Sequence, residues 1–281
     1  MNGVLESMTP ILLAALGGLL AERSGLMNIA LEGLMLAGAF TAVLVTYLTG
    51  SWLLGTGAAV LMGIFWAALL SLVHHRLNTN LFISALALNL LIPTLATFTT
   101  QALFGHKGSL RLENLPGLYL GDLPYGISVF VPLALILTLL VGLFLAYTPL
   151  GIRLRTAGAS PELLASRGLS LEKYRWIGLL ASGALSALAG AALSLRLGSF
   201  VPGMSAGRGW IALVVLFLGY QKAWGLLAAS LLFGGAEVLA HSLQLWIEIP
   251  TAVVMSLPFW VTLLFLTLYS KAHQRGISKN R

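Results

Sequence analysis

The chain has 281 residues, of which 58% are hydrophobic and only 9% charged, and its mean hydropathy is +0.93. One soluble core cannot bury that much apolar surface, so we expect an integral membrane protein in contact with lipid. The net charge of +7 does not indicate a nucleic-acid partner, because the basic residues lie in short connections between apolar runs and not in one patch.

Apolar runs follow one another along almost the whole chain. They are long, rich in Leu, Ala and Gly, and lack the alternating pattern of an outer-membrane barrel. We therefore predict an all-α, polytopic transmembrane helical bundle of about eight or nine membrane segments, forming a single transmembrane domain over residues 1–281. The N-terminus lacks the features of a signal peptide, so the first run counts as a span. The runs cover residues 7–20, 29–48, 52–73, 81–103, 126–147, 176–195, 209–218, 224–247 and 251–269.

Two of these runs, 7–20 and 209–218, are shorter than the ~20 residues that a crossing helix needs. We expect each to be a broken or re-entrant helix. Residues 25–39 and 203–210 also share a pattern, because both pass from polar, glycine-containing sequence into an apolar run. This pattern is typical of an internal repeat with broken helices, as in many transporters, although glycine packing between helices produces it too.

The segment from Glu22 to Gly33 places polar groups between two apolar runs. Asn28 and Glu32 are four residues apart, so a helix that starts near Asn28 would present both on one face. They either line a solute path or form a buried pair that fixes a helix bend. Asn89 and Ser84 in the fourth run likewise either face the path or only form hydrogen bonds between helices.

Glu237 and His241 are also four apart, inside the run that starts at Trp224. They indicate a proton relay or an interhelical hydrogen bond. Residues 203–207 match the G-x-S-x-G pattern, and Ser205 with His241 would suggest an intramembrane hydrolase. That chemistry needs a strand directly before the serine, which this stretch lacks. No P-loop, metal-binding spacing or cysteine occurs, so we expect no ATP site, metal site or disulfide in this chain.

The distribution of Lys and Arg predicts the orientation in the membrane. If the connection 148–175 is cytoplasmic, twelve basic residues fall inside and four outside, as the positive-inside rule requires. The loop 105–125, with turns at 116–117 and 121–124, then lies on the outer face. The inside set is Arg23, Arg76, Arg153, Arg155, Arg167, Lys173, Arg175, Lys222, Lys271, Arg275, Lys279 and Arg281; the outside set is Lys107, Arg111, Arg196 and Arg208.

The connection 148–175 contains the signals of a short helix. Ser160 suits the N-cap, Pro161 the first helical position and Glu162 the helix dipole, while Gly168 would end the helix after Arg167. Such a helix either contacts a partner or is a solvated turn between two spans.

Three stretches of the chain resemble a known family. They read ERSGLMNIALEGLMLAGAF, PLGIRLRTAGASPELLASRGLS, and GSFVPGMSAGRGWIALVVLFLG followed by WGLLAASLLFGGAEVL. In this order they are similar to the permease subunits of bacterial ATP-binding-cassette (ABC) importers of the branched-chain amino acid and simple-sugar group, and within it to the nucleoside-type branch.

The resemblance implies a permease in the bacterial cytoplasmic (inner) membrane that forms half of a translocation path. Its partners would be a related second permease, a cytoplasmic ATPase that holds ATP and magnesium, an extracytoplasmic solute-binding lipoprotein, and membrane lipid. The permease itself would not be an enzyme and would carry no cofactor. The path residues would be Asn28, Glu32, Asn89, Ser205, Arg208 and Trp210. In the coupling loop 148–175, Gly158, Ala165 and Gly168 match the small-residue pattern, with Glu162, Leu164 and Arg167 as ATPase contacts.

The sequence departs from the family pattern at residues 220–225, where nucleoside-type relatives carry an Arg-Trp-Asn-Pro-like turn. The resemblance implies a nucleoside or a similar ring-bearing solute, and because of this departure riboflavin and a simple sugar stay open as alternatives. The chain also lacks a long N-terminal extension, which fits the shorter member of a heterodimeric pair. An ion-coupled secondary transporter with Glu32 or Glu237 as proton site is the alternative from another class.

Overall fold

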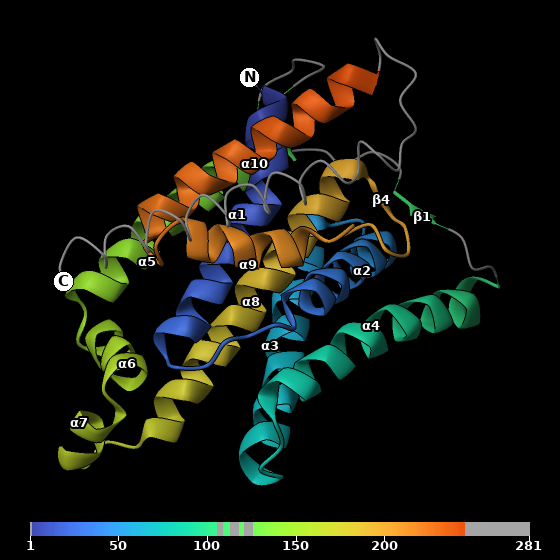
Figure 1. Cartoon of the computed structure of the whole chain (residues 1–281). Coiled ribbons are helices and arrows are strands. Elements are labelled where there is room, and N and C mark those ends of the chain that lie inside the picture. Colours follow the sequence, from blue (N-terminus) through green and yellow to red (C-terminus); the bar gives the residue numbers. More distant parts are fainter. Residues whose placement is uncertain (1, 106–108, 113–117, 121–125, 245–281) are drawn as a thin grey trace.

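The computed structural model describes residues 2–105, 109–112, 118–120 and 126–244, and these form a helical bundle (Figure 1). Within these ranges seven helices are long and apolar enough to cross a membrane. The predicted all-α, multi-pass architecture is confirmed, while the predicted run 251–269 and the end of run 224–247 lie outside the described residues. The seven are α1 (Asn2–Arg23), α2 (Leu31–Thr49), α3 (Trp52–Arg76), α4 (Leu81–Phe104), α5 (Phe130–Tyr147), α8 (Leu171–Leu197) and α10 (Ala223–Gln244).

Helix α1 is the most buried of the spans and packs against α8, α10 and α5. The prediction that the first apolar run is short or broken is wrong, because the polar residues around it extend the helix to 22 residues. Pro10 lies inside it, next to Thr9, whose hydroxyl donates to the Leu5 carbonyl at 2.7 Å. The other short run does form a short helix, α9 (Arg208–Leu218), which packs against α1.

Helix α8 crosses α2 and α3 at small residues. A Cβ atom at Gly190 would lie 1.8 Å from the carbonyl oxygen of Met35, and one at Gly183 would lie 2.3 Å from that of Gly63. Only glycine allows backbones to approach this closely, as in many membrane bundles. The Gly-rich composition therefore brings α2, α3 and α8 into one tight group.

Among the described residues, four two-residue strands, which the sequence did not predict, lie at one end of the bundle. β1 (Leu110–Arg111) pairs with β4 (Ser199–Phe200), and β2 (Tyr119–Leu120) pairs with β3 (Ile127–Ser128), both antiparallel. The buried Glu6 carboxylate accepts from the Ser128 amide at 2.5 Å and lies 3.4 Å from the Arg196 guanidinium. Lys107 and the predicted turns at 116–117 and 121–124 lie outside the described residues.

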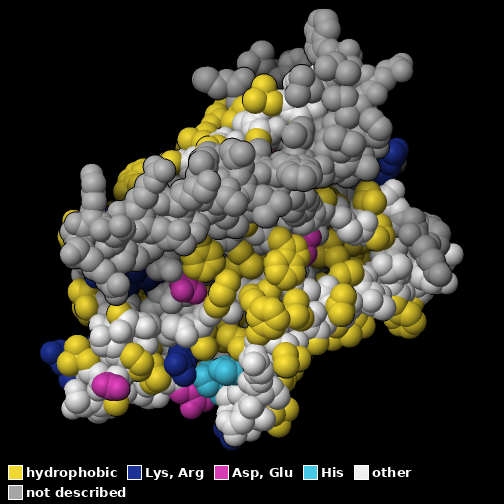
Figure 2. All heavy atoms as spheres, viewed as in Figure 1, with side chains coloured by type: hydrophobic (Ala, Val, Ile, Leu, Met, Phe, Trp, Pro, Cys, Tyr) yellow, Lys and Arg dark blue, Asp and Glu magenta, His cyan; other side chains and the backbone are white. Residues whose placement is uncertain are grey.

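The opposite end carries two short helices, α6 (Pro149–Ala159) and α7 (Pro161–Ser166), where one was predicted. Thr148 caps α6 by accepting from the Gly151 amide at 3.0 Å, and Pro149 takes the first helical position. Ser160 precedes α7 as predicted, but its side chain makes no capping hydrogen bond. Charged side chains gather at this end, whereas apolar side chains cover most of the described surface in this view (Figure 2).

Candidate translocation site at the start of α2 and α9

The two segments with the shared sequence pattern meet in the structure. Residues 24–30 lead into α2, residues 201–207 lead into α9, and Glu32 in the first turn of α2 joins them. Its Oε1 atom accepts from the Gly207 amide at 2.9 Å and its Oε2 atom from the Gly209 amide at 2.7 Å. A carboxylate is well suited there, because the first N–H groups of a helix lack partners within the helix and the dipole favours negative charge. Glu32 thus caps α9 from another helix.

The backbone around Gly209 is shaped for this contact. A Cβ atom at Gly209 would lie 2.5 Å from the Cα atom of Glu32, so no larger residue fits there without a shift. Gly207 has φ +83° and Ala206 has φ +47°, which turns the chain sharply before α9 begins. The start of α9 therefore lies directly against the start of α2.

Asn28 lies before α2 and not on it. The prediction that Asn28 and Glu32 share one helix face is wrong, because the helix begins only at Leu31. Asn28 is 1% exposed; its Oδ1 atom accepts from the Ala30 amide at 3.0 Å and its Nδ2 atom donates to the Ser182 hydroxyl of α8 at 2.9 Å. Asn28 therefore holds the turn into α2 against α8.

Asn89 of α4 holds the same turn from the other side. Its Oδ1 atom accepts from the Gly33 amide at 2.8 Å, and its Nδ2 atom donates to the Ile29 carbonyl at 3.0 Å. Ser84, the other polar residue considered on this helix, instead donates to the Asn80 carbonyl at the start of α4. The structure thus brings Asn28, Glu32 and Asn89 together around one turn.

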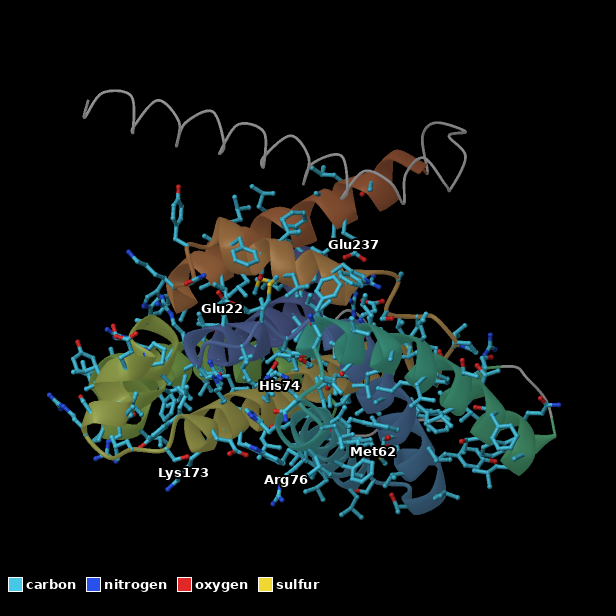
Figure 3. The ribbon with its side chains drawn as sticks, turned by 60° about the horizontal axis from the view of Figure 1, so that its bottom comes forward. Glu22, Met62, His74, Arg76, Lys173 and Glu237 are labelled. Atoms are coloured by element: carbon cyan, nitrogen blue, oxygen red, sulfur yellow. The ribbon has the colours of Figure 1, made fainter. Side chains whose placement is uncertain are left out.

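Arg208 and Glu237 form an ion pair between α9 and α10, and Glu237 lies on the side of α10 that faces α9 (Figure 3). Arg208 also donates to the carbonyls of Met204 at 3.2 Å and Ser205 at 3.3 Å. Of the two interpretations of Glu237, the interhelical contact is therefore the one present, while the His241 side chain lies outside the described residues. Arg208, one of the predicted path residues, lies inside the bundle, where its side chain is 18% exposed.

Ser205 and Trp210 differ in accessibility. Ser205 is buried in a series of turns that separates it from β4, so the strand-to-serine geometry of a hydrolase is missing. Trp210 is exposed, and so is Phe217, which lies seven positions later on the same face of α9. Phe217 was missed because a single aromatic residue in an apolar run carries no polar signal. The α9 helix therefore presents an aromatic face beside its polar start.

The residues expected to contact the ATPase lie on the α6–α7 hairpin and in the turn that follows it. A Cβ atom at Gly158 would lie 2.6 Å from the Arg23 carbonyl oxygen, so α6 touches the loop between α1 and α2 directly. Leu164, expected as an ATPase contact, is 1% exposed and packs on Ala157 and Tyr174, whereas the neighbouring Leu163 is exposed. The other expected coupling residues Glu162, Ala165, Arg167 and Gly168 are exposed.

Comparisons with known proteins agree with this architecture. The family model for the permease component of branched-chain amino acid transport systems matches residues 1–268. The chain is 32% identical to the guanosine ABC transporter permease protein NupQ of Bacillus subtilis, with 92% of this chain and 88% of the relative covered. It is 30% identical to the nucleoside ABC transporter permease protein NupC of Lactococcus lactis, with 93% and 89% covered.

A third relative carries a different solute in its name. The putative glucose ABC transporter permease protein TsgC13 of Haloferax volcanii is 32% identical over 85% of this chain and 76% of its own length. No solved structure matches the chain significantly.

Proposed function

The chain belongs to the family of permease components of branched-chain amino acid transport systems, and from this membership we propose that it forms half of the translocation path of an ABC importer for nucleosides. The observation that carries the proposal is the family match over nearly the whole chain, together with NupQ and NupC, whose names specify guanosine and nucleoside transport. The resemblance to this permease family and the multi-pass membrane location inferred from the sequence are thereby confirmed.

The geometry supports a path beside α9. Trp210 and Phe217 expose aromatic rings on one face of this helix, and a flat nucleobase stacks favourably on such rings. Glu32, Arg208 and Glu237 hold the polar start of α9 in place through protein contacts. We therefore assign the solute contacts to Trp210 and Phe217, and to Asn28, Glu32, Asn89, Ser205 and Arg208 the task of shaping the path.

The proposed machinery includes a second, related permease. Three organisms each contribute two relatives of this chain: NupQ and NupP from Bacillus subtilis, NupC and NupB from Lactococcus lactis, and TsgC13 and TsgB13 from Haloferax volcanii. This pairing supports a heterodimer. A cytoplasmic ATPase would dock on the α6–α7 hairpin through Leu163, Glu162 and Arg167, which are exposed. The permease would lie in a bacterial cytoplasmic membrane. A lipoprotein would deliver the solute to its opposite end, which carries the strands.

A simple sugar is the second candidate solute, because the glucose-named relative has the same 32% identity to this chain as NupQ, over a somewhat smaller share of the chain. The deciding experiment is uptake into proteoliposomes that contain this chain, its sister permease, the ATPase and the binding protein. We expect ATP-dependent uptake of radiolabelled guanosine that unlabelled nucleosides block and glucose or riboflavin does not. Uptake blocked by glucose would overturn the nucleoside assignment but not the permease function.

The same vesicles separate an ABC permease from an ion-coupled transporter. Glu32 and Glu237 both act as acceptors in structural contacts, so neither could exchange a proton without disturbing α9. We therefore expect no uptake by this chain alone under a proton gradient without ATP. Gradient-driven uptake by this chain alone would contradict the proposal.

The coupling role is tested at Gly168, which follows α7 with φ +69° and has open space around it. Valine there strains the backbone without a clash, because β-branched residues avoid positive φ. We expect Gly168→Val to keep assembly but to reduce both uptake and solute-stimulated ATPase activity at least roughly tenfold. Gly50→Val is the matched control, since Gly50 has the same φ and open surroundings at the end of α2.

A further inference from the structure

A cavity of about 490 Å³ opens at the end of the bundle that carries α6. It is bounded by the ends of α1 and α5, by the middle of α6 and by the beginning of α10; α5, α6 and the beginning of α10 lie close together in Figure 1. Three cations line it: Arg23 from α1, Arg155 from α6 and Lys222 from the turn before α10. None of the path or coupling residues named above belongs to this cavity.

The three cations lack carboxylate partners within the described part of the chain. Arg23 donates to the Gln221 carbonyl at 2.5 Å and Arg155 to the Leu145 carbonyl at 3.2 Å, and neither these two nor Lys222 has an ion pair there. Each guanidinium has five N–H donors, so most of them stay available. The neighbouring acid, Glu22 (labelled in Figure 3), accepts from the Gln221 side chain at 3.3 Å and offsets one charge. The cavity therefore has an excess of positive charge and of donors.

The remaining wall of the cavity is apolar and belongs mainly to α5. Leu139, Leu143 and Tyr147 follow at four-residue spacing on one exposed face of this helix and all line the cavity. Trp224, also exposed, stands at the beginning of α10. An apolar stripe that leads from the membrane to cations, with Tyr and Trp at the polar end, has the features of a lipid site at a membrane interface.

We propose that this cavity binds an anionic phospholipid. Its phosphate would lie among Arg23, Arg155 and Lys222, and one acyl chain would follow Leu139 and Leu143 along α5. The Lys and Arg distribution places this end on the cytoplasmic side, where basic pockets between helices bind acidic headgroups. The apolar stripe decides in favour of a lipid, because a soluble phosphate or an acidic protein segment would leave it without a partner. The bound lipid would connect α6 to the end of α1 and to the beginning of α10, whichever solute is transported.

The test compares lipid retention by the full chain and two double variants. Purified protein is exposed to equal amounts of phosphatidylglycerol and phosphatidylcholine, and the retained lipid is counted by native mass spectrometry. Arg155→Gln/Lys222→Gln removes two cavity cations, while the control Arg153→Gln/Lys173→Gln removes two exposed cations outside it. Each cation near the membrane surface raises the affinity for an anionic lipid roughly fivefold. The first variant should therefore bind phosphatidylglycerol roughly 25-fold more weakly, whereas the affinity of the control should stay within about twofold of that of the unchanged chain.

Equal loss in both variants, or no loss in the first, would overturn the proposal. Two competitors test the source of the phosphate: inorganic phosphate and glycerophosphoglycerol, the headgroup without acyl chains. We expect neither to displace the lipid at equal concentration, and displacement by either would show a phosphate-only site. Melting temperatures within a few degrees of the unchanged chain confirm that both variants fold. Release of the lipid when the sister permease and the ATPase are added would show instead that the cavity is a protein-docking surface.

Discussion

The starts of α2 and α9 look alike in sequence but are held in different ways. The turn into α2 depends on two uncharged amides, Asn28 and Asn89, which bond to its backbone and to α8. The start of α9 depends on charge, with Glu32 on its amides and the Arg208–Glu237 pair beside it. Since Glu32 belongs to α2 and Glu237 to α10, the position of α9 is set by two neighbouring helices. A shift between α2 and α10 would therefore be felt first at α9.

The largest effect is expected when the carboxylate at the start of α9 is removed. Glu32→Ala leaves two amides at the start of α9 without a partner, and hydrogen bonds to a charged group contribute about 2 kcal/mol each, so the free energy of unfolding should fall by about 4 kcal/mol. Denaturation of the purified protein in detergent measures this free energy of unfolding. Glu22→Ala is the control, because that carboxylate makes one 3.3 Å contact at the end of α1 and should cost under about 1 kcal/mol. A loss under about 1 kcal/mol for Glu32→Ala would show that the cap does not hold α9.

Next in size is the ion pair. Arg208→Leu leaves Glu237 unpaired inside the bundle and should lower the free energy of unfolding by about 3 kcal/mol. The double variant Arg208→Leu/Glu237→Leu removes both charges and should recover more than half of that loss. A double-mutant cycle on the same detergent assay gives the coupling energy. Additive losses would mean that the two side chains do not depend on each other.

The smallest effect is expected on the uncharged side. Asn28→Ala removes the bonds to the Ala30 amide and the Ser182 hydroxyl, at about 1 kcal/mol each for neutral hydrogen bonds. Ser182→Ala removes only the second, so the loss should be about half as large, and the double variant should match Asn28→Ala. If Asn28→Ala destabilises more than Glu32→Ala, the contrast between the two helix starts is reversed.

Much of the bundle could be predicted because a spanning helix depends mainly on an apolar run of sufficient length. Helix ends were less predictable. The sequence reading placed the start of α8 at Trp176, but Ser170 caps the helix and extends it five residues further, to Leu171. Helix α6 was missed because Arg153 and Arg155 interrupt the apolar pattern, although Thr148 and Pro149 are a cap signal that could have found it.

The site could be predicted in its members but not in its contacts. The high cost of polar groups in lipid drew attention to Glu32, Asn28 and Asn89, and the structure brings these three residues together around one turn. Four-residue spacing wrongly placed Asn28 and Glu32 on one helix, because the turn before Leu31 interrupts it. The partners of Glu32 lie 175 and 177 residues away, and no local pattern encodes such a distance.

The contact between Gly158 and the loop that contains Gly25 can transmit movement from α6 to that loop. A Cβ atom built on Gly25 would lie 3.1 Å from the Cα atom of Gly158, so two main chains touch there without side chains between them. Side chains can absorb displacement by changing rotamer, whereas two peptide backbones in contact cannot. This contact is therefore rigid, and any movement of α6 toward α1 displaces the turn into α2 directly.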